Sequence, residues 1–255
     1  MNPNVSKIYD IEKDILGEPQ EYKGIKFYPI KLLGESKYKN LFHSLLCYPK
    51  NTIPDKKVLK MFYLKFILRV MGFDKKDDLE DFLRHICRTD KIQILFEDIE
   101  SLSDIENIKF YIQFGDVKIT EYEFDDIREI ILQQNGSSIE YINKYDADLE
   151  EKMQFINREF NELTFEENIF TFCCLSGLSV SDLKDYTMYQ FKKHSTRLSL
   201  WRNYEAFKPV EVVNPSKDGK EVIKHYLTHV DDNDRYGAIL IKRKDFEEGN
   251  GKYFQ

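Results

Sequence analysis

The sequence predicts an α+β protein that is mostly helical, with a β-containing N-terminal half and a helical C-terminal subdomain. Apolar residues recur at helical spacing along most of the chain, whereas segments of the first half alternate apolar and polar side chains. The 42% of hydrophobic residues, with 19 Phe and 16 Tyr in 255 residues, indicates a folded chain. We expect an α+β domain over residues 1–145 and a helical subdomain with a mixed C-terminal tail over residues 146–255.

The N-terminal half is predicted to begin with a hairpin and helices. Residues 21–30 alternate around a turn at Gly24, and Pro29 ends the second strand or confines it to an edge. Helices should follow, because apolar residues then return at helical spacing between capping and breaking residues. These helices are expected from Ser36 to Cys47 before Pro49, from Pro54-Asp55 to Met71 with Gly72 as C-cap, and from Asp77 or Asp78 onward.

Strands and one more helix are predicted to complete this half. Residues 91–97 and 108–114 alternate, and Gly115-Asp116 predicts a tight turn into residues 117–120. The period then changes to that of a helix from Phe124 to Gln134, which Asn135-Gly136 ends.

The C-terminal half is predicted to be mainly helical. Its sequence alternates helix caps with apolar runs, and Thr164 and Glu167 match a capping box. The expected elements are a helix over residues 148–160, a helix ending at Gly177, a cap at residues 179–182, a helix from Thr187 to about Phe207, a helix around residues 221–229 and a strand over residues 238–241. Trp201 and Tyr204 are either an aromatic anchor of this subdomain or part of its core, and the core is the favoured interpretation.

Charge is distributed unevenly. The chain carries a net charge of −7, but residues 23–76 carry +10 and residues 77–167 carry −16. Either the two blocks attract each other within the fold or between copies, or the basic block meets phosphate or an acidic partner. For any single charged residue of the two blocks, the alternative is that it belongs to an ordinary solvated helix surface and contacts no partner. The candidate partner-binding residues are Lys56, Lys57, Lys60, Lys65, Asp125, Asp126 and Glu129.

No complete catalytic or metal-binding motif is present. His225 and His229 have the i, i+4 spacing of a metal pair, but Tyr226 stands where a zinc protease has its glutamate. The acidic turn 231–234 resembles a calcium loop, yet Arg243 replaces the bidentate glutamate. Glycine-rich phosphate loops and nucleophile elbows are missing as well. We therefore expect no enzymatic activity, no cofactor and no metal.

The cysteines and the hydropathy pattern predict an intracellular protein. None of the four cysteines belongs to a CxxC pair, and all lie in apolar stretches, which fits a reducing compartment. The first residues lack the apolar run of a signal peptide. Residues 58–73 form the most apolar stretch, but Lys60, Lys65 and Arg69 interrupt it, so no membrane contact is expected.

Helix caps and apolar anchors between Phe124 and Phe207 form a further pattern. They lie in residues 124–135, 163–167, 175–183 and 188–191. This part of the chain resembles morphogenesis proteins of tailed bacteriophages that infect low-GC Gram-positive bacteria, including tail assembly chaperones. The resemblance implies a non-enzymatic protein that contacts tail, tube or tape-measure subunits, and the two charged blocks would then allow head-to-tail contacts with these neighbours or between copies. It also implies a location in the host cytoplasm during assembly, with or without incorporation into the virion.

A nucleic-acid-binding accessory protein is the alternative function. Lysines of the basic block 23–76 interleave with aromatic residues, a mixture that can follow phosphates and stack on bases. Core packing explains the same aromatic residues, since they also lie at helical spacing. These residues are Tyr38, Phe42, Tyr48, Phe62, Tyr63 and Phe66.

Overall fold

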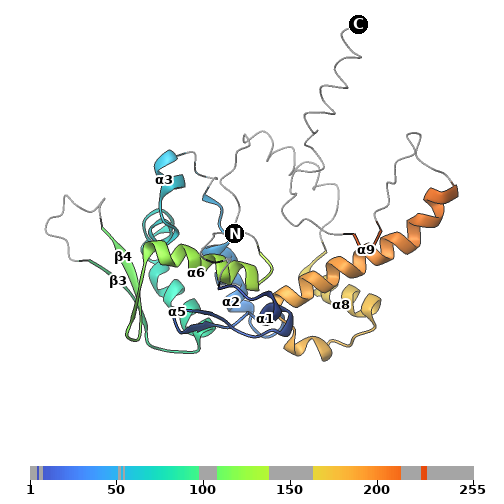
Figure 1. The fold of residues 1–255 in the computed structure, drawn as a ribbon, viewed down its shortest axis with the longest axis horizontal. Coiled ribbons are helices and arrows are strands. Elements are labelled where there is room, and N and C mark those ends of the chain that lie inside the picture. The colour runs from blue at the N-terminus through green and yellow to red at the C-terminus, as the bar shows by residue number, and fades with distance from the viewer. Residues whose placement is uncertain are drawn as a thin grey trace, which may run out of the picture.

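A computed structural model describes Val5 and residues 8–50, 53, 55–97, 108–137, 163–213 and 225–228. Helices and small antiparallel sheets form one body, and the long helix α9 (Met188–Val213) extends from it to one side (Figure 1). The predicted class is confirmed: the protein is α+β and mostly helical, with its strands in the N-terminal half.

The N-terminal hairpin is confirmed, and a short helix precedes it. Helix α1 (Ile11–Leu16) was not predicted; the Asp10 side chain caps it, and Gly17 ends it at a φ of 73°. Strands β1 (Gln20–Tyr22) and β2 (Ile25–Phe27) pair antiparallel. Lys23 and Gly24 both have positive φ between these strands, as the tightest hairpin turns require.

The first predicted helix is confirmed, whereas the second is broken. Chain direction changes at Met61 and Phe62, whose ψ values of 143° and 147° are extended. The break leaves the N–H of Tyr63 without a helical acceptor, and Asp125 Oδ1 accepts its hydrogen bond at 2.8 Å. The helical segments here are α2 (Ser36–Leu41), the π-helical η2 (Phe42–Leu46), α3 (Lys56–Lys60), α4 (Tyr63–Phe66), the π-helical η4 (Ile67–Met71) and α5 (Lys75–Cys87).

The sheet of the first half has the order β3-β4-β5 and is antiparallel throughout. Gly115 has a φ of 56° in the turn between β4 and β5, where glycine carries no steric penalty. The last helix of this half begins earlier than predicted, because Thr120 and Glu123 form a capping box. The bounds are β3 (Ile92–Phe96), β4 (Phe110–Phe114), β5 (Val117–Thr120) and α6 (Glu121–Gln134).

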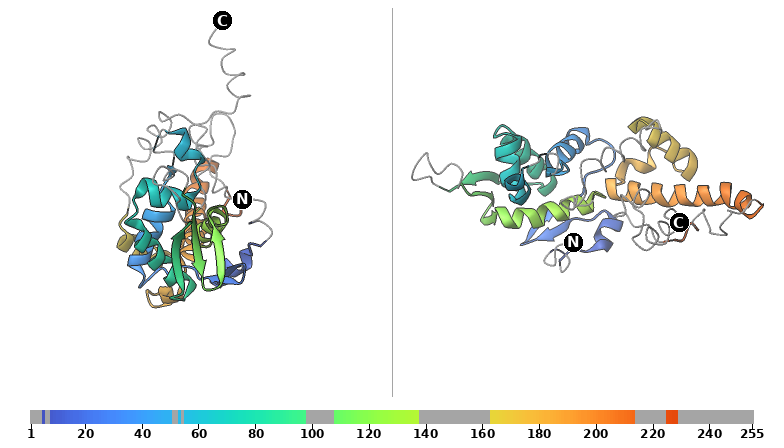
Figure 2. Two further views of the ribbon diagram at one scale, coloured as in Figure 1. Left: turned by 90° about the vertical axis from the view of Figure 1, so that its left-hand side faces the viewer. Right: turned by 90° about the horizontal axis from the view of Figure 1, so that it is seen from above.

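Two hydrophobic clusters hold these elements together. The large one is filled from the hairpin, the helices α4 to α6 and the sheet, with Phe27, Leu64 and Ile127 fully buried. The small one lies between the helices of the C-terminal half, where α8 packs along the first part of α9 (Figure 2). Its buried members are Leu32, Ile169, Phe172, Leu183 and Leu198.

The C-terminal helices follow the predicted caps. Thr164 and Glu167 form the capping box of α8 (Phe165–Ser176), and Gly177 ends that helix at a φ of 76°. A short 3-10 helix, η6 (Asp182–Asp185), then leads to α9. The predicted end of α9 near Phe207 is wrong: the helix continues past Pro209 to Val213. Proline loses one hydrogen bond there, but its fixed φ is helical.

Several predicted features fall on other parts of the chain. The helix over residues 148–160, the strand over residues 238–241 and the boundary at residues 145–146 lie outside the described residues. Residues 225–228 form a turn rather than part of the predicted helix. In the part of the chain that the structure describes, no helix is long and apolar enough to cross a membrane.

Candidate functional site

The basic residues predicted to bind a partner lie on neighbouring short helices. Lys56, Lys57 and Lys60 are exposed on α3, and Lys65 is half-buried in α4. None of the three lysines of α3 forms an ion pair with a described residue. They therefore place unpaired positive charge at the edge of the molecule where α3 lies (Figure 1).

The acidic residues predicted to bind a partner face the interior instead. Asp126 and Glu129 on α6 are only 2% and 4% exposed, and Asp125 is half-buried. Asp126 and Glu129 are therefore largely covered by the fold, although Asp126 lines a hollow beside Tyr22 and Lys23, and their role in binding a partner stays a prediction. Sequence reasoning missed this because these carboxylates share α6 with the core residues on both sides of them.

Asp125 serves to position α4. Besides accepting from the Tyr63 N–H, it lies near Arg128, whose guanidinium stacks 3.5 Å from the centre of the Tyr63 ring. Arg128 also donates to the Leu46 carbonyl at 2.9 Å, which joins α6 to the end of η2. Burial raises the pKa of Asp125, and the Tyr63 N–H, Lys50 and Arg128 oppose that rise.

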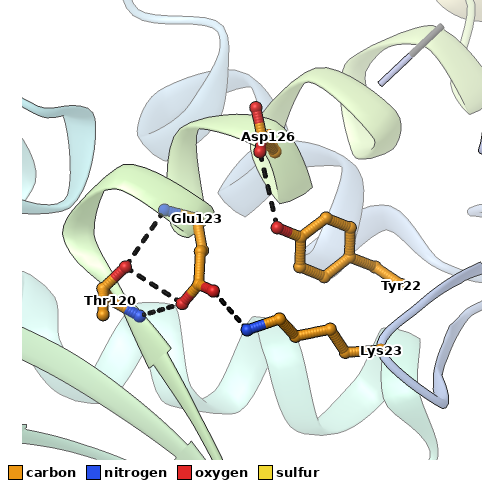
Figure 3. A network of polar contacts seen from close by, with 5 residues as sticks. All are labelled: Tyr22, Lys23, Thr120, Glu123 and Asp126. Atoms are coloured by element: carbon orange, nitrogen blue, oxygen red, sulfur yellow. Dashed lines mark hydrogen bonds and ion pairs between the residues drawn. The ribbon is translucent and has the colours of Figure 1, made fainter. Parts of the chain in front are cut away.

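A second polar network ties the hairpin to the start of α6 (Figure 3). The Tyr22 hydroxyl donates to Asp126 Oδ2 at 3.4 Å, and Lys23 forms an ion pair with Glu123, which also caps α6 through Thr120. Burial, together with nearby Asp126 and Glu123, raises the pKa of Tyr22 to about 12. Burial also raises the pKa of Asp126. These contacts join the hairpin β1–β2 to the start of α6.

Two aromatic side chains stand exposed beside α3. Phe62 is 41% and Tyr122 is 50% exposed, and their rings meet edge to face with centres 6.2 Å apart. Of the interleaved aromatic residues in the basic block, Phe42, Tyr63 and Phe66 are core residues. Tyr122 was missed by sequence reasoning, although the capping box at Thr120 would have placed it in the first turn of α6.

The C-terminal helices carry a separate apolar groove of about 550 Å³. Leu175, Leu198, Trp201 and Leu227 contribute its apolar lining, and His194 and Arg197 lie beside them. The prediction of Trp201 as a core residue is wrong, since it is 39% exposed, while Tyr204 is half-buried against His225 and Tyr226.

Arginine side chains hold the walls of this groove. Arg197 donates to the carbonyls of Tyr226 and Thr228 at 3.2 and 2.9 Å, which fastens the turn 225–228 against α9. Arg202 donates to the Leu175 carbonyl at 3.3 Å and so bridges α9 to the end of α8. Both guanidinium groups thus already have hydrogen-bond acceptors within the fold. The groove between them is lined mainly by apolar side chains.

Metal ligation finds no support in the described residues. No three His, Cys, Asp or Glu side chains of the described ranges are grouped closely enough to hold a metal ion. His229 and the acidic turn 231–234 lie outside those ranges. Cys47, Cys87, Cys173 and Cys174 are not joined to one another by disulfides.

The region of the groove also matches a known family. The family model for the YomV second domain matches residues 156–231, which include α8, η6 and α9. That family is of Bacillus phage type, from the SPBc2 prophage. The match indicates a phage-derived protein. No curated protein and no solved structure matches the chain. The phage part of the sequence resemblance is thereby confirmed, and a role in the tail remains a prediction.

Proposed function

We propose that this phage-derived protein is a non-enzymatic morphogenesis protein that binds tail, tube or tape-measure subunits through its C-terminal helices. It serves either as an assembly chaperone or as a structural component of the tail or virion. One observation carries the proposal: the second half of α9 exposes large apolar side chains within the region that matches the phage-type family.

The exposed residues continue along successive turns of α9. Phe207, Val210, Val212 and Val213 are between 53% and 86% exposed, and of these Phe207, Val210 and Val213 recur every three residues and so lie toward one side of the helix. A surface helix ordinarily turns its apolar side chains toward a core, and contiguous exposed apolar residues mark an interaction surface. The 26 residues of α9 make a rod of about 39 Å, along which the groove and the exposed residues follow one another.

The first half of α9 is anchored, which favours binding by the second half. The Met188 N–H donates to the Ile30 carbonyl at 3.1 Å, and Leu198 is buried in the small hydrophobic cluster. A helix held in this way loses little conformational freedom when a partner binds, so less of the binding energy is spent on ordering. The groove at Trp201 suits an inserted apolar side chain, because its arginines are already engaged.

Gradient sedimentation of a lysate from the native host, with mass spectrometry of the fractions, tests this function. Sedimentation with complete particles at fixed stoichiometry supports a structural component, and presence with tail precursors in lighter fractions supports a chaperone. The variant Phe207→Ser/Val210→Ser should no longer sediment with the particles or the tail precursors. The control Phe73→Ser/Phe96→Ser, which alters exposed apolar residues of the first half, should remain. A protein found only as a free monomer, or equal behaviour of both variants, contradicts the proposal.

A further inference from the structure

We propose that the surface around α3 binds single-stranded nucleic acid, with lysines on the phosphates and two aromatic rings on the bases. We call this surface the basic-aromatic patch. It comprises Lys56, Lys57, Lys60, Phe62 and Tyr122. The inference is independent of the proposed function, because it concerns a different surface and a different class of partner.

The helix geometry gathers the positive charge of the patch. Lys60 lies three and four residues after Lys57 and Lys56, so the three side chains are neighbours on successive turns of α3. All three are exposed and lack an ion-pair partner among the described residues. A lysine that is already paired with a carboxylate gains little binding free energy from a phosphate. These three lysines are unpaired within the described residues, so a phosphate can pair with each of them.

The helix break adds the aromatic part. Extended backbone at Met61 and Phe62 ends α3 and turns Phe62 outward, against the ring of Tyr122 from the start of α6. Exposed rings next to lysines are the combination with which proteins bind unpaired bases without sequence preference. Bases in a duplex are stacked on one another and do not offer their faces, so the patch fits a single strand.

The carboxylates near the patch are each held in place within the fold, and Asp55 caps α3 itself by accepting from the Lys57 N–H at 2.8 Å. Glu121 accepts from the Phe110 N–H at 2.8 Å, Glu123 pairs with Lys23, and Asp125 accepts from the Tyr63 N–H. Lys56, Lys57 and Lys60 outnumber Asp55 on α3 and its cap, so the local charge is positive although the whole chain carries −7.

The patch and the proposed protein-binding surface are far apart. Figure 1 shows α3 and the second half of α9 at opposite sides of the molecule. A nucleic acid on α3 and a protein on α9 can therefore be bound at the same time.

Fluorescence anisotropy of a labelled 20-nucleotide oligo-dT with the full-length protein tests the proposal. The variant Lys56→Gln/Lys57→Gln/Lys60→Gln should bind about 10-fold more weakly at low salt. The slope of log K against log salt should decrease by about 2, because each phosphate contact contributes about 0.7. The control Lys26→Gln/Lys91→Gln/Lys184→Gln removes the same charge from exposed lysines elsewhere and should bind like the unmodified protein. No binding by the unmodified protein, or equal losses in both variants, overturns the proposal.

The aromatic residues are tested separately from the charge. Phe62→Ala and Tyr122→Ala should each weaken oligo-dT binding about 5-fold or more, the effect of losing one stacked base. Inorganic polyphosphate has the charge but no bases, so its binding should not change. Thermal unfolding of each variant verifies that it folds. Equal losses for oligo-dT and polyphosphate, or equal affinity for duplex and single strand, refute base stacking on a single strand.

Discussion

Leu32 should decide whether the C-terminal helices stay folded, although it belongs to the N-terminal half. Residues 30–32 run between the two hydrophobic clusters, with Ile30 buried in the large one and Leu32 in the small one. The Leu32 N–H donates to the Tyr186 carbonyl at 2.8 Å, just before α9 begins. We predict that Leu32→Ala loosens α8 and α9 while the first half remains folded.

The size of the effect follows from the packing. Leu32 is fully buried, and the small cluster has few other buried members among the described residues to close the cavity that alanine leaves. Leucine-to-alanine changes in cores cost about 2–5 kcal/mol, and the cost increases with the residual cavity. A loss of about 3 kcal/mol increases the equilibrium constant for local unfolding of α8 and α9 roughly 100-fold.

Hydrogen exchange measured by mass spectrometry provides the assay. In Leu32→Ala, amides of α8 and the first half of α9 should exchange roughly 100-fold faster than in the unmodified protein. Those of α5 and the sheet should exchange at nearly unchanged rates. The matched control Leu64→Ala, at a fully buried leucine of the large cluster, should affect α5 and the sheet first. Exchange in α8 of Leu32→Ala within about threefold of normal would refute the role given to Leu32.

Three further changes test the local arguments. Asp125→Ala should cost about 1–3 kcal/mol in urea unfolding because it leaves the Tyr63 N–H without its acceptor, and Asp125→Asn should cost less; equal costs contradict this. Thr120→Ala should cost about 1 kcal/mol by removing the cap of α6, and a stability within error of normal contradicts it. Burial raises the pKa of Asp14, while hydrogen bonds from Tyr9 and Gln20 oppose the rise. The folded state then binds more protons, so stability falls as pH increases from about 4 through the raised pKa. Asp14→Asn should gain stability relative to the unmodified protein over that range, and a constant difference contradicts this.

Local sequence signals predicted most of the elements because neighbouring residues decide them. The positive-φ turn at Gly24, the capping box at Thr164 and the stop at Gly177 each depend on a few adjacent residues. The apolar period of two residues likewise marked the strands around Gly115. The same reasoning missed α1, whose six residues are held by contacts with distant parts of the chain, including the Gln190 side chain bonded to the Ile15 carbonyl.

The candidate site was harder to predict, because exposure is a property of the packed chain. A lysine and an aspartate look equally polar in a sequence, yet Lys56 lies in solvent and Asp126 lies inside. Trp201 was predicted to be a core residue. Other residues form the small hydrophobic cluster, and Trp201 lines the groove instead.

By itself, the sequence determined the fold class, the order of most helices and strands, and the resemblance to phage proteins. Only the tertiary structure decided the break at Met61 and Phe62, since the acceptor that stabilises it, Asp125, lies more than sixty residues further along the chain. It also decided which charges remain free and which apolar residues remain exposed. Both depend on contacts between segments far apart in sequence, and a local pattern carries no information about those contacts.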